Sequence, residues 1–133
     1  MTVATLGQKT VLVIEDDPWT RTITTALLAG EGFAVVEAKN GEEGLSQARA
    51  HTPDAILLDL ALPTKSGLEV LRELKSDTAM QAIPVIVVSA YGTLMNENDV
   101  HQTAGVIQKP FDYDDLVGQV ERATAPSLEP ALT

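Results

Sequence analysis

The sequence contains no cysteine among its 133 residues, and aromatic residues make up only 4%. Without cysteine the chain can form no disulfide, no thiolate nucleophile and no cysteine-ligated metal centre. Hydrophobic residues nevertheless reach 44%, so the core must be aliphatic, built from Val, Ile, Leu and Ala. The length suits one compact domain and leaves little room for a second.

Positive charge is also scarce, because nine Lys and Arg stand against 19 Asp and Glu, for a formal net charge of -10. Such an acidic chain argues against binding to nucleic acid or to an anionic membrane surface. No apolar run approaches the roughly 18 residues that a membrane span needs, and residues 1–9 lack the apolar core of a signal peptide. We therefore expect a cytoplasmic protein that binds neither nucleic acid nor membrane.

Short apolar runs alternate with helix-like segments five times along the chain. Continuous β-branched runs are typical of strands buried on both faces of a parallel sheet, so the pattern predicts an α/β fold. The expected strands are 11–14, 34–36, 55–58, 85–88 and 106–107, and the expected helices are 19–29, 42–50, 67–75, a short one within 96–103, and 114–123. Residues 10–124 would form the domain, with 1–9 as an extension and 125–133 as a flexible tail.

Polar residues follow four of the five predicted strands. In open α/β sheets the carboxyl ends of the strands meet at one edge, where ligands bind. The residues delivered to that edge are Glu15, Asp16 and Asp17 after the first strand, Asp59 after the third, Ser89 after the fourth, and Lys109 and Pro110 after the fifth. This combination is a much stronger signal than any of its members alone.

These residue types suit phosphoryl chemistry on a metal site. Clustered carboxylates repel one another unless a cation intervenes, and oxygen donors favour Mg²⁺ over Zn²⁺. The Ser89 hydroxyl and the Lys109 ammonium are suited to bind phosphoryl oxygens. An Asp such as Asp59 is a known type of covalent phosphoryl acceptor. The pattern therefore predicts that Asp59 gains and loses a phosphoryl group.

The chain resembles the receiver domains of response regulators, including those of chemotaxis, over about residues 10 to 124. The resemblance rests on "VLVIEDDP", on "LLDLALPTKSG" with Pro63 and Gly67 at the family spacing, on "VIVVSA", on "KPF" and on "NGEEGL". It implies a flavodoxin-like (βα)5 fold, a doubly wound five-stranded parallel sheet in the order 2-1-3-4-5. It also implies a place in two-component signalling, as a phosphorylation switch or a phosphorelay intermediate.

The resemblance further implies a role for each site residue. Asp59 would be the phosphoacceptor, and Glu15, Asp16, Asp59 and the backbone carbonyl of Ala61 would hold Mg²⁺, or Mn²⁺ in its place. The receiver would not be an enzyme in its own right, because it catalyses only its own phosphorylation and dephosphorylation.

Ser89 and Lys109 would bind the phosphoryl group, and the peptide bond before Pro110 would be cis. The donor would be a phosphohistidine on a histidine kinase or a phosphotransfer protein. That partner would dock on the first helix, including Trp19, and on the loop after Lys109, although Trp19 could equally be a simple packing residue. The protein itself would be a monomer or a weak dimer, and its downstream partner is a protein that the sequence does not identify.

Three other polar residues near these motifs have simpler interpretations. Asp17 precedes Pro18 at the expected start of the first helix, so it is predicted to be a helix cap rather than a metal ligand. His51 and His101 lack ligand spacing to any other His, so we expect both at the surface.

The sequence departs from the family pattern at the fifth strand and at the mouth of the site. Receivers usually place an aromatic three positions before the Lys, where it turns inward on activation, but Val106 occupies that position and is stiff at its side-chain torsion. We expect an altered switch and a signalling surface away from the usual fourth-helix face. Ala61 and Tyr91 follow Asp59 and Ser89 by two positions; Ala61 cannot orient a water and Tyr91 would cover the phosphoryl group, so we expect slow autodephosphorylation.

Three other classes of protein share some of these features. A phosphatase with an Asp nucleophile needs a second Asp two residues later, and Ala61 stands there, so that class fails. An interaction domain that keeps the fold without taking phosphate is another alternative. The changes near Val106 leave it open, but the presence of the full set of site residues argues against it: Glu15, Asp16, Asp59, Ser89 and Lys109. A receiver fragment of a longer regulator is another.

Overall fold

The computed structural model describes residues 8–90 and 95–126. Within them, five parallel strands form one sheet in the order β2-β1-β3-β4-β5. The strands are β1 (Thr10–Ile14), β2 (Ala34–Ala38), β3 (Ala55–Asp59), β4 (Val85–Ser89) and β5 (Gly105–Gln108). The helices are α2 (Pro18–Gly30), α3 (Gly41–His51), α4 (Gly67–Ser76), α5 (Glu97–His101) and α6 (Tyr113–Thr124). This arrangement confirms the predicted fold and its strand order.

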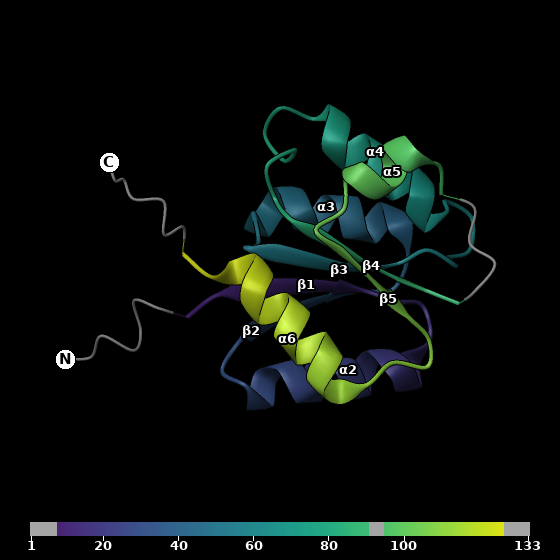
Figure 1. Ribbon diagram of the computed structural model, residues 1–133. Helices are drawn as coiled ribbons and strands as arrows, with labels where there is room; N and C mark the ends of the chain where they lie inside the picture. Colours follow the sequence, from purple (N-terminus) through teal and green to yellow (C-terminus); the bar gives the residue numbers. More distant parts are fainter. Residues whose placement is uncertain (1–7, 91–94, 127–133) are drawn as a thin grey trace.

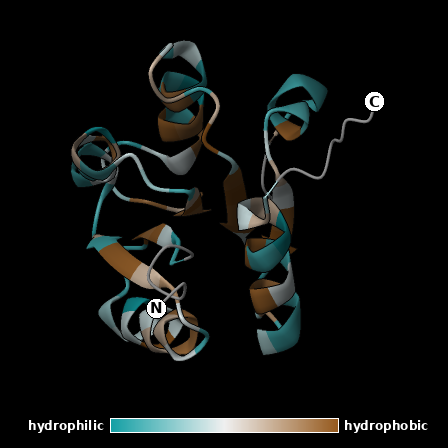
Figure 2. Cartoon of the chain, turned by 90° about the vertical axis from the view of Figure 1, so that its left-hand side faces the viewer, coloured by the Kyte–Doolittle hydropathy of each residue, from teal (hydrophilic) through white to brown (hydrophobic). Residues whose placement is uncertain are grey.

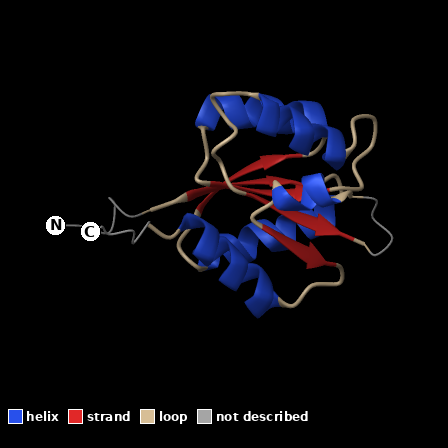
Figure 3. Ribbon diagram, turned by 45° about the horizontal axis from the view of Figure 1, so that its top comes forward, coloured by secondary structure: helices blue, strands red, loops and turns tan. Residues whose placement is uncertain are grey.

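Helices cover both faces of the sheet, with α3, α4 and α5 on one side and α2 and α6 on the other (Figures 1 and 3). Because successive side chains of a strand point to opposite faces, β1 supplies both halves of the core. Leu12 and Ile14 join the cluster under α3 and α4, whereas Val11 and Val13 join the cluster under α2 and α6. Figure 2 shows hydrophobic residues along the strands and on stretches of the helices. Each fully buried Leu or Ile stabilises the fold by roughly 1.5–3 kcal/mol.

Helix caps fix where the chain turns away from the ends of the strands. The Asp17 carboxylate accepts a hydrogen bond from Thr20 N at 2.8 Å at the start of α2, which confirms its predicted role. Asn40 caps α3 in the same way, and Ser66 forms a reciprocal capping box with Glu69 at the start of α4. Caps of this kind typically contribute about 1 kcal/mol each. They keep the loops that carry the polar residues short.

The central and edge strands differ in burial. Strands β3 and β4 are buried at every residue and β1 at all but its first, which explains their continuous apolar sequences. The edge strands β2 and β5 are only partly buried, and Val106 on β5 is 40% exposed. The weaker apolar signal at 34–36 and 106–107 reflects this edge position. Helix α5 has only five residues and lies within the short segment expected there.

None of the helices in the described residues combines the length and the apolar character needed to cross a membrane. The longest of them, α2, has 13 residues, whereas a spanning helix needs about 20. The apolar faces of α4 and α6 are instead covered by the sheet, where Leu71, Leu74 and Leu116 are fully buried.

Candidate functional site

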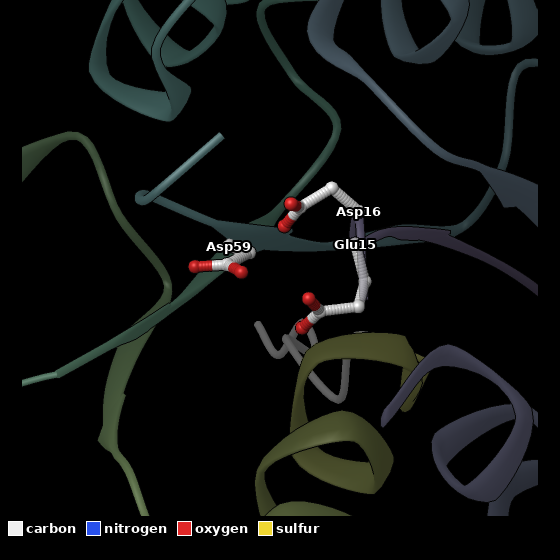
Figure 4. A group of neighbouring side chains, drawn as sticks. All are labelled: Glu15, Asp16 and Asp59. Atoms are coloured by element: carbon white, nitrogen blue, oxygen red, sulfur yellow. The ribbon is translucent and has the colours of Figure 1, made fainter. Parts of the chain in front are cut away.

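Three carboxylates meet at the carboxyl edge of the sheet because β1 and β3 are neighbouring parallel strands with Ile14 opposite Leu58. The residues that follow are therefore adjacent: Glu15 and Asp16 after β1, and Asp59 at the end of β3 (Figure 4). One oxygen from each carboxylate lies within 4.8 Å of the others. Glu15 and Asp59 are 5% and 4% exposed, while Asp16 is exposed. The structure thus builds a pocket with two buried acids and a third open to solvent.

Lys109 reaches the same group from the end of β5. Its Nζ lies 3.2 Å from Asp59 Oδ2 and 3.3 Å from Glu15 Oε1. The Lys109 N–H donates to the backbone carbonyl of Ser89 at 2.8 Å, which ties the end of β5 to the end of β4. Ser89 is buried and pairs in register with Gln108. The four predicted strand ends are therefore assembled at one edge, and the Lys109–Pro110 peptide bond is cis.

The charges of the site perturb one another. Burial raises the pKa of Glu15 above its usual 4.5, the hydrogen bond from Asp17 N at 3.0 Å opposes this, and the charge of Asp59 adds to it. Burial lowers the pKa of Lys109, but the charges of Asp59 and Glu15 outweigh burial, so the net shift is upward from 10.5. Lys109 is therefore charged at neutral pH, and its charge offsets part of the repulsion between the two buried acids.

The backbone after Asp59 holds the acid in a fixed orientation. Asp59 Oδ1 accepts a hydrogen bond from Ala61 N at 2.9 Å, which leaves Oδ2 for Lys109. Gly67 N donates to Leu60 O at 3.1 Å, so the loop folds back on the end of β3. A Cβ at Gly67 would collide with the backbone at Asp59 and Leu60, which explains why only glycine fits there. The loop that begins α4 therefore also fixes the backbone of Asp59.

The donor set fits a hard divalent cation. Three carboxylates and one ammonium leave a formal charge of about -2 in a mostly buried site, which a divalent cation would neutralise. Carboxylate oxygens are the ligands that Mg²⁺ prefers, and this group contains no thiolate or imidazole to favour Zn²⁺ or Cu²⁺. The role of the Ala61 carbonyl stays a prediction.

An apolar groove of about 400 Å³ adjoins the site on the side of α2. Trp19 in the first turn of α2 is 72% exposed and forms one wall. The lining residues are Trp19, Thr20, Ile23, Lys109, Pro110 and Phe111. Because Lys109 belongs to both the groove and the acidic pocket, a molecule bound in the groove would lie next to Asp59.

Other residues singled out in the sequence lie away from this pocket. His51 and His101 are exposed at the last residues of α3 and α5, as expected. Val106 is exposed on β5. Tyr91 lies outside the described residues, so the prediction for it stands untested.

Sequence reasoning missed the ion pairs of Arg21 and Arg72, among others. Arg21 of α2 pairs with Glu37 of β2 at 3.1 Å and also donates to the Glu15 carbonyl at 2.9 Å. Arg72 of α4 pairs with Asp99 of α5, a buried acid, at 2.8 Å. The only signal for Arg21 was its place one turn after the cap Asp17. Nothing local connects Arg72 with a residue 27 positions away.

Comparisons with known proteins agree with this geometry. The family model of the response regulator receiver domain matches residues 11–121. The polar-differentiation response regulator DivK of Brucella anthropi is 38% identical over 115 residues, which cover 85% of this chain and 94% of that protein. The DivK of Brucella ovis is 37% identical over the same length and shares of the two chains.

Solved structures show the same fold. A response regulator from Chloroflexus aurantiacus J-10-fl superposes with a TM-score of 0.81 at 26% identity, covering 90% of this chain and 99% of that one. The receiver domain of a sensor histidine kinase from Pseudomonas aeruginosa PAO1 gives 0.80 at 25% identity, covering 90% and 99%, and was solved with a magnesium ion coordinated in its active site cleft. Fold, site and sequence agree, and the chain belongs to the response regulator receiver domain family.

Proposed function

We propose that this receiver domain accepts a phosphoryl group on Asp59 from a phosphohistidine donor, in a reaction that depends on Mg²⁺ or Mn²⁺. The cluster of Asp59, Glu15 and Asp16 with the Lys109 ammonium 3.2 Å from Asp59 carries this proposal. The modified domain then acts in the cytoplasm as a phosphorylation switch or a phosphorelay intermediate through contacts with other proteins. It catalyses its own modification and no separate turnover.

The proposed transfer is a displacement at phosphorus. A carboxylate oxygen of Asp59 forms a bond to the phosphorus, the bond from phosphorus to the donor imidazole nitrogen breaks, and that nitrogen keeps the electron pair. The Lys109 ammonium and the Ser89 hydroxyl donate hydrogen bonds to phosphoryl oxygens.

Charge explains the dependence on a cation. The pocket already carries about -2, and a phosphoryl group brings further negative charge next to two buried acids. Glu15, Asp16, Asp59 and the Ala61 carbonyl would hold the cation, which supplies positive charge opposite the phosphoryl oxygens when bound. Lys109 alone cannot balance this charge, so we expect no measurable transfer after chelation of the metal.

Labelling with acetyl phosphate tests the proposal. Wild-type protein in Mg²⁺ should gain one phosphoryl group, and Asp59→Asn should gain none. Asp54→Asn, which changes an exposed acid at the opposite end of β3, is the matched control and should label normally. Absence of labelling in wild-type protein that binds Mg²⁺ would instead favour a phosphate-independent interaction domain.

The donor protein is proposed to dock on the groove beside α2. Exposed aromatic residues are frequent centres of binding energy at protein interfaces, and Trp19 is the largest exposed side chain of this groove. Trp19→Ala should slow transfer from phosphorylated kinases or phosphotransfer proteins of the source organism, while acetyl phosphate labelling stays unchanged. Equal slowing with both donors would contradict a docking role and indicate damage to the site.

The phosphorylated state of Asp59 is proposed to be long-lived. Ala61 is exposed beside Asp59 and has only a methyl group, which cannot orient a water for hydrolysis. Ala61→Asn should therefore shorten the lifetime of phosphorylated Asp59, and an unchanged lifetime would contradict this account.

The surface that transmits the signal is proposed to be unusual as well. Val106 offers no aromatic ring to turn inward, so we propose that the signal leaves through a surface other than the face of the fourth helix, α5, that receivers usually use.

A further inference from the structure

The loop between β1 and α2 carries two of the three clustered acids, and its backbone is fixed at several points. Glu15 N donates to Ala38 O at 3.0 Å, which extends the pairing of β1 with β2. Asp17 N donates to the carboxylate of Glu15 at 3.0 Å. Arg21 Nη1 then donates to the Glu15 carbonyl at 2.9 Å, with the Asp16 carbonyl at 3.5 Å.

The guanidinium of Arg21 connects this loop to the neighbouring strand. Its Nε donates to Glu37 Oε1 on β2 at 3.1 Å, while Nη1 faces the loop. The Arg21 side chain is only 19% exposed, and that of Glu37 is 43% exposed. A planar guanidinium with several donors holds both groups at once, which a lysine ammonium on a flexible stem cannot reproduce.

We propose that Arg21 is a positioning residue for the metal site, and this inference rests on the proposed Mg²⁺ binding. By holding the carbonyls of Glu15 and Asp16 against β2, Arg21 fixes the backbone from which both carboxylates extend toward Asp59. Residues that orient ligands typically change metal affinity by 10- to 100-fold when they are replaced. Arg21 acts on the backbone rather than on the ligand atoms, so we expect an effect near the lower limit.

Two effects of Arg21 on the cation oppose each other. Its positive charge lies near the site and would repel a cation, so removal of the charge alone would tighten binding. Glu37 pairs with Arg21 and cancels much of this charge, whereas it leaves the hydrogen bonds to the loop in place. Loss of positioning should therefore outweigh loss of repulsion, and replacement of Arg21 should weaken Mg²⁺ binding.

Calorimetric titration of the full chain with Mg²⁺ tests this inference. Arg21→Gln and Arg21→Lys should each raise the Mg²⁺ Kd about tenfold, and Glu37→Gln should raise it less. Arg122→Gln, which removes an exposed arginine from α6, is the matched control and should leave the Kd unchanged. Arg21→Lys keeps the positive charge but loses the planar guanidinium with its several donors, so this variant separates positioning from electrostatics.

Thermal unfolding without Mg²⁺ separates positioning from general stability. A purely structural role would lower the Tm of the Arg21 variants and leave their Kd at the wild-type value, which would overturn the inference. A lower Kd in Arg21→Gln would overturn it as well, because repulsion would then dominate. If Arg21→Gln does not fold, Arg21→Lys and Glu37→Gln decide the question. Wild-type protein that binds no Mg²⁺ would overturn the proposed metal site itself.

Discussion

The region where β1 and β3 end differs sharply from the region at the outer side of the sheet, where the last strand β5 and the helix α5 lie. At the first, Glu15 and Asp59 are almost fully buried, and hydrogen bonds fix the backbone on both sides of each acid. At the second, Val106 is 40% exposed on an edge strand and α5 has five residues. Side chains at the ends of buried strands are held in place by the core. Side chains on the outward-facing side of β5 and α5 can be replaced without disturbing the core.

The attachment of α5 shows how different the second region is. Asp99 in α5 is buried and accepts two hydrogen bonds from Arg72 of α4, at 3.1 and 2.8 Å. The same carboxylate accepts from Asn96 N in the capping box of the helix. One acid thus both begins α5 and attaches it to α4. The position of α5 depends strongly on this pair, whereas several hydrogen bonds and the Lys109 ion pairs together hold the ends of β1 and β3.

The largest expected contrast comes from adding one methyl group in each region. Gly67→Ala forces a Cβ against the backbone of Asp59 and Leu60 and should cost about 3 kcal/mol of unfolding free energy. Gly105→Ala on β5 meets only the end of the Gln119 side chain, which can move, and should cost less than about 1 kcal/mol. Urea unfolding of both variants measures the contrast, and equal losses would contradict it.

A smaller effect is expected at Lys109. Lys109→Met leaves two buried acids without a cation and should cost roughly 2 kcal/mol without Mg²⁺, less than for a fully buried pair because Lys109 is 29% exposed. Saturating Mg²⁺ should restore most of this stability, while Lys39→Met, which alters an exposed lysine after β2, should change little in either condition. If Mg²⁺ does not reduce the loss of unfolding free energy in Lys109→Met, charge repulsion between the buried acids is not its cause.

At the second region, Asp99→Asn should destabilise the protein in a manner that depends on pH. The hydrogen bonds from Arg72 lower the pKa of Asp99 below 3.8, so the folded state favours the carboxylate. Its contribution is therefore present above pH 3.8 and is lost as pH falls through the lowered pKa. The difference in Tm between wild type and Asp99→Asn should therefore shrink on acidification. A constant difference would argue against the ion pair.

The smallest effect is expected at Val106. Because its side chain is 40% exposed, Val106→Ala should change the unfolding free energy by no more than about 0.5 kcal/mol. Phosphorylation by acetyl phosphate should also proceed at the wild-type rate. A large loss of stability would show that Val106 packs more tightly than its exposure indicates, and that the two regions are less distinct.

The sequence predicted which residues would gather at one edge of the sheet, because strand ends are local features. Continuous apolar runs located β1, β3 and β4, and the polar residues after them had to meet at one edge. Asp17 was predictable as a cap for the same reason, since its partner Thr20 lies three residues away. The close approach of Gly67 to the end of β3 adds a packing reason for the glycine at the family spacing.

Long-range side-chain pairs could not be predicted. Arg21 and Glu37 are 16 residues apart, and Arg72 and Asp99 are 27 apart, so no helical or strand periodicity links them. An acid in a short polar segment is expected to lie at the surface, yet Asp99 is only 2% exposed. Only the packing of α5 on α4 reveals the partner that offsets its burial.

A structure of the protein with Mg²⁺ and beryllofluoride, a mimic of the phosphoryl group, tests the central claim most directly. The account predicts the mimic on Asp59, in contact with the Ser89 hydroxyl and the Lys109 ammonium, and Val106 in its outward orientation. The mimic bound away from Asp59, or Val106 turned inward together with a displacement of α5, would contradict it.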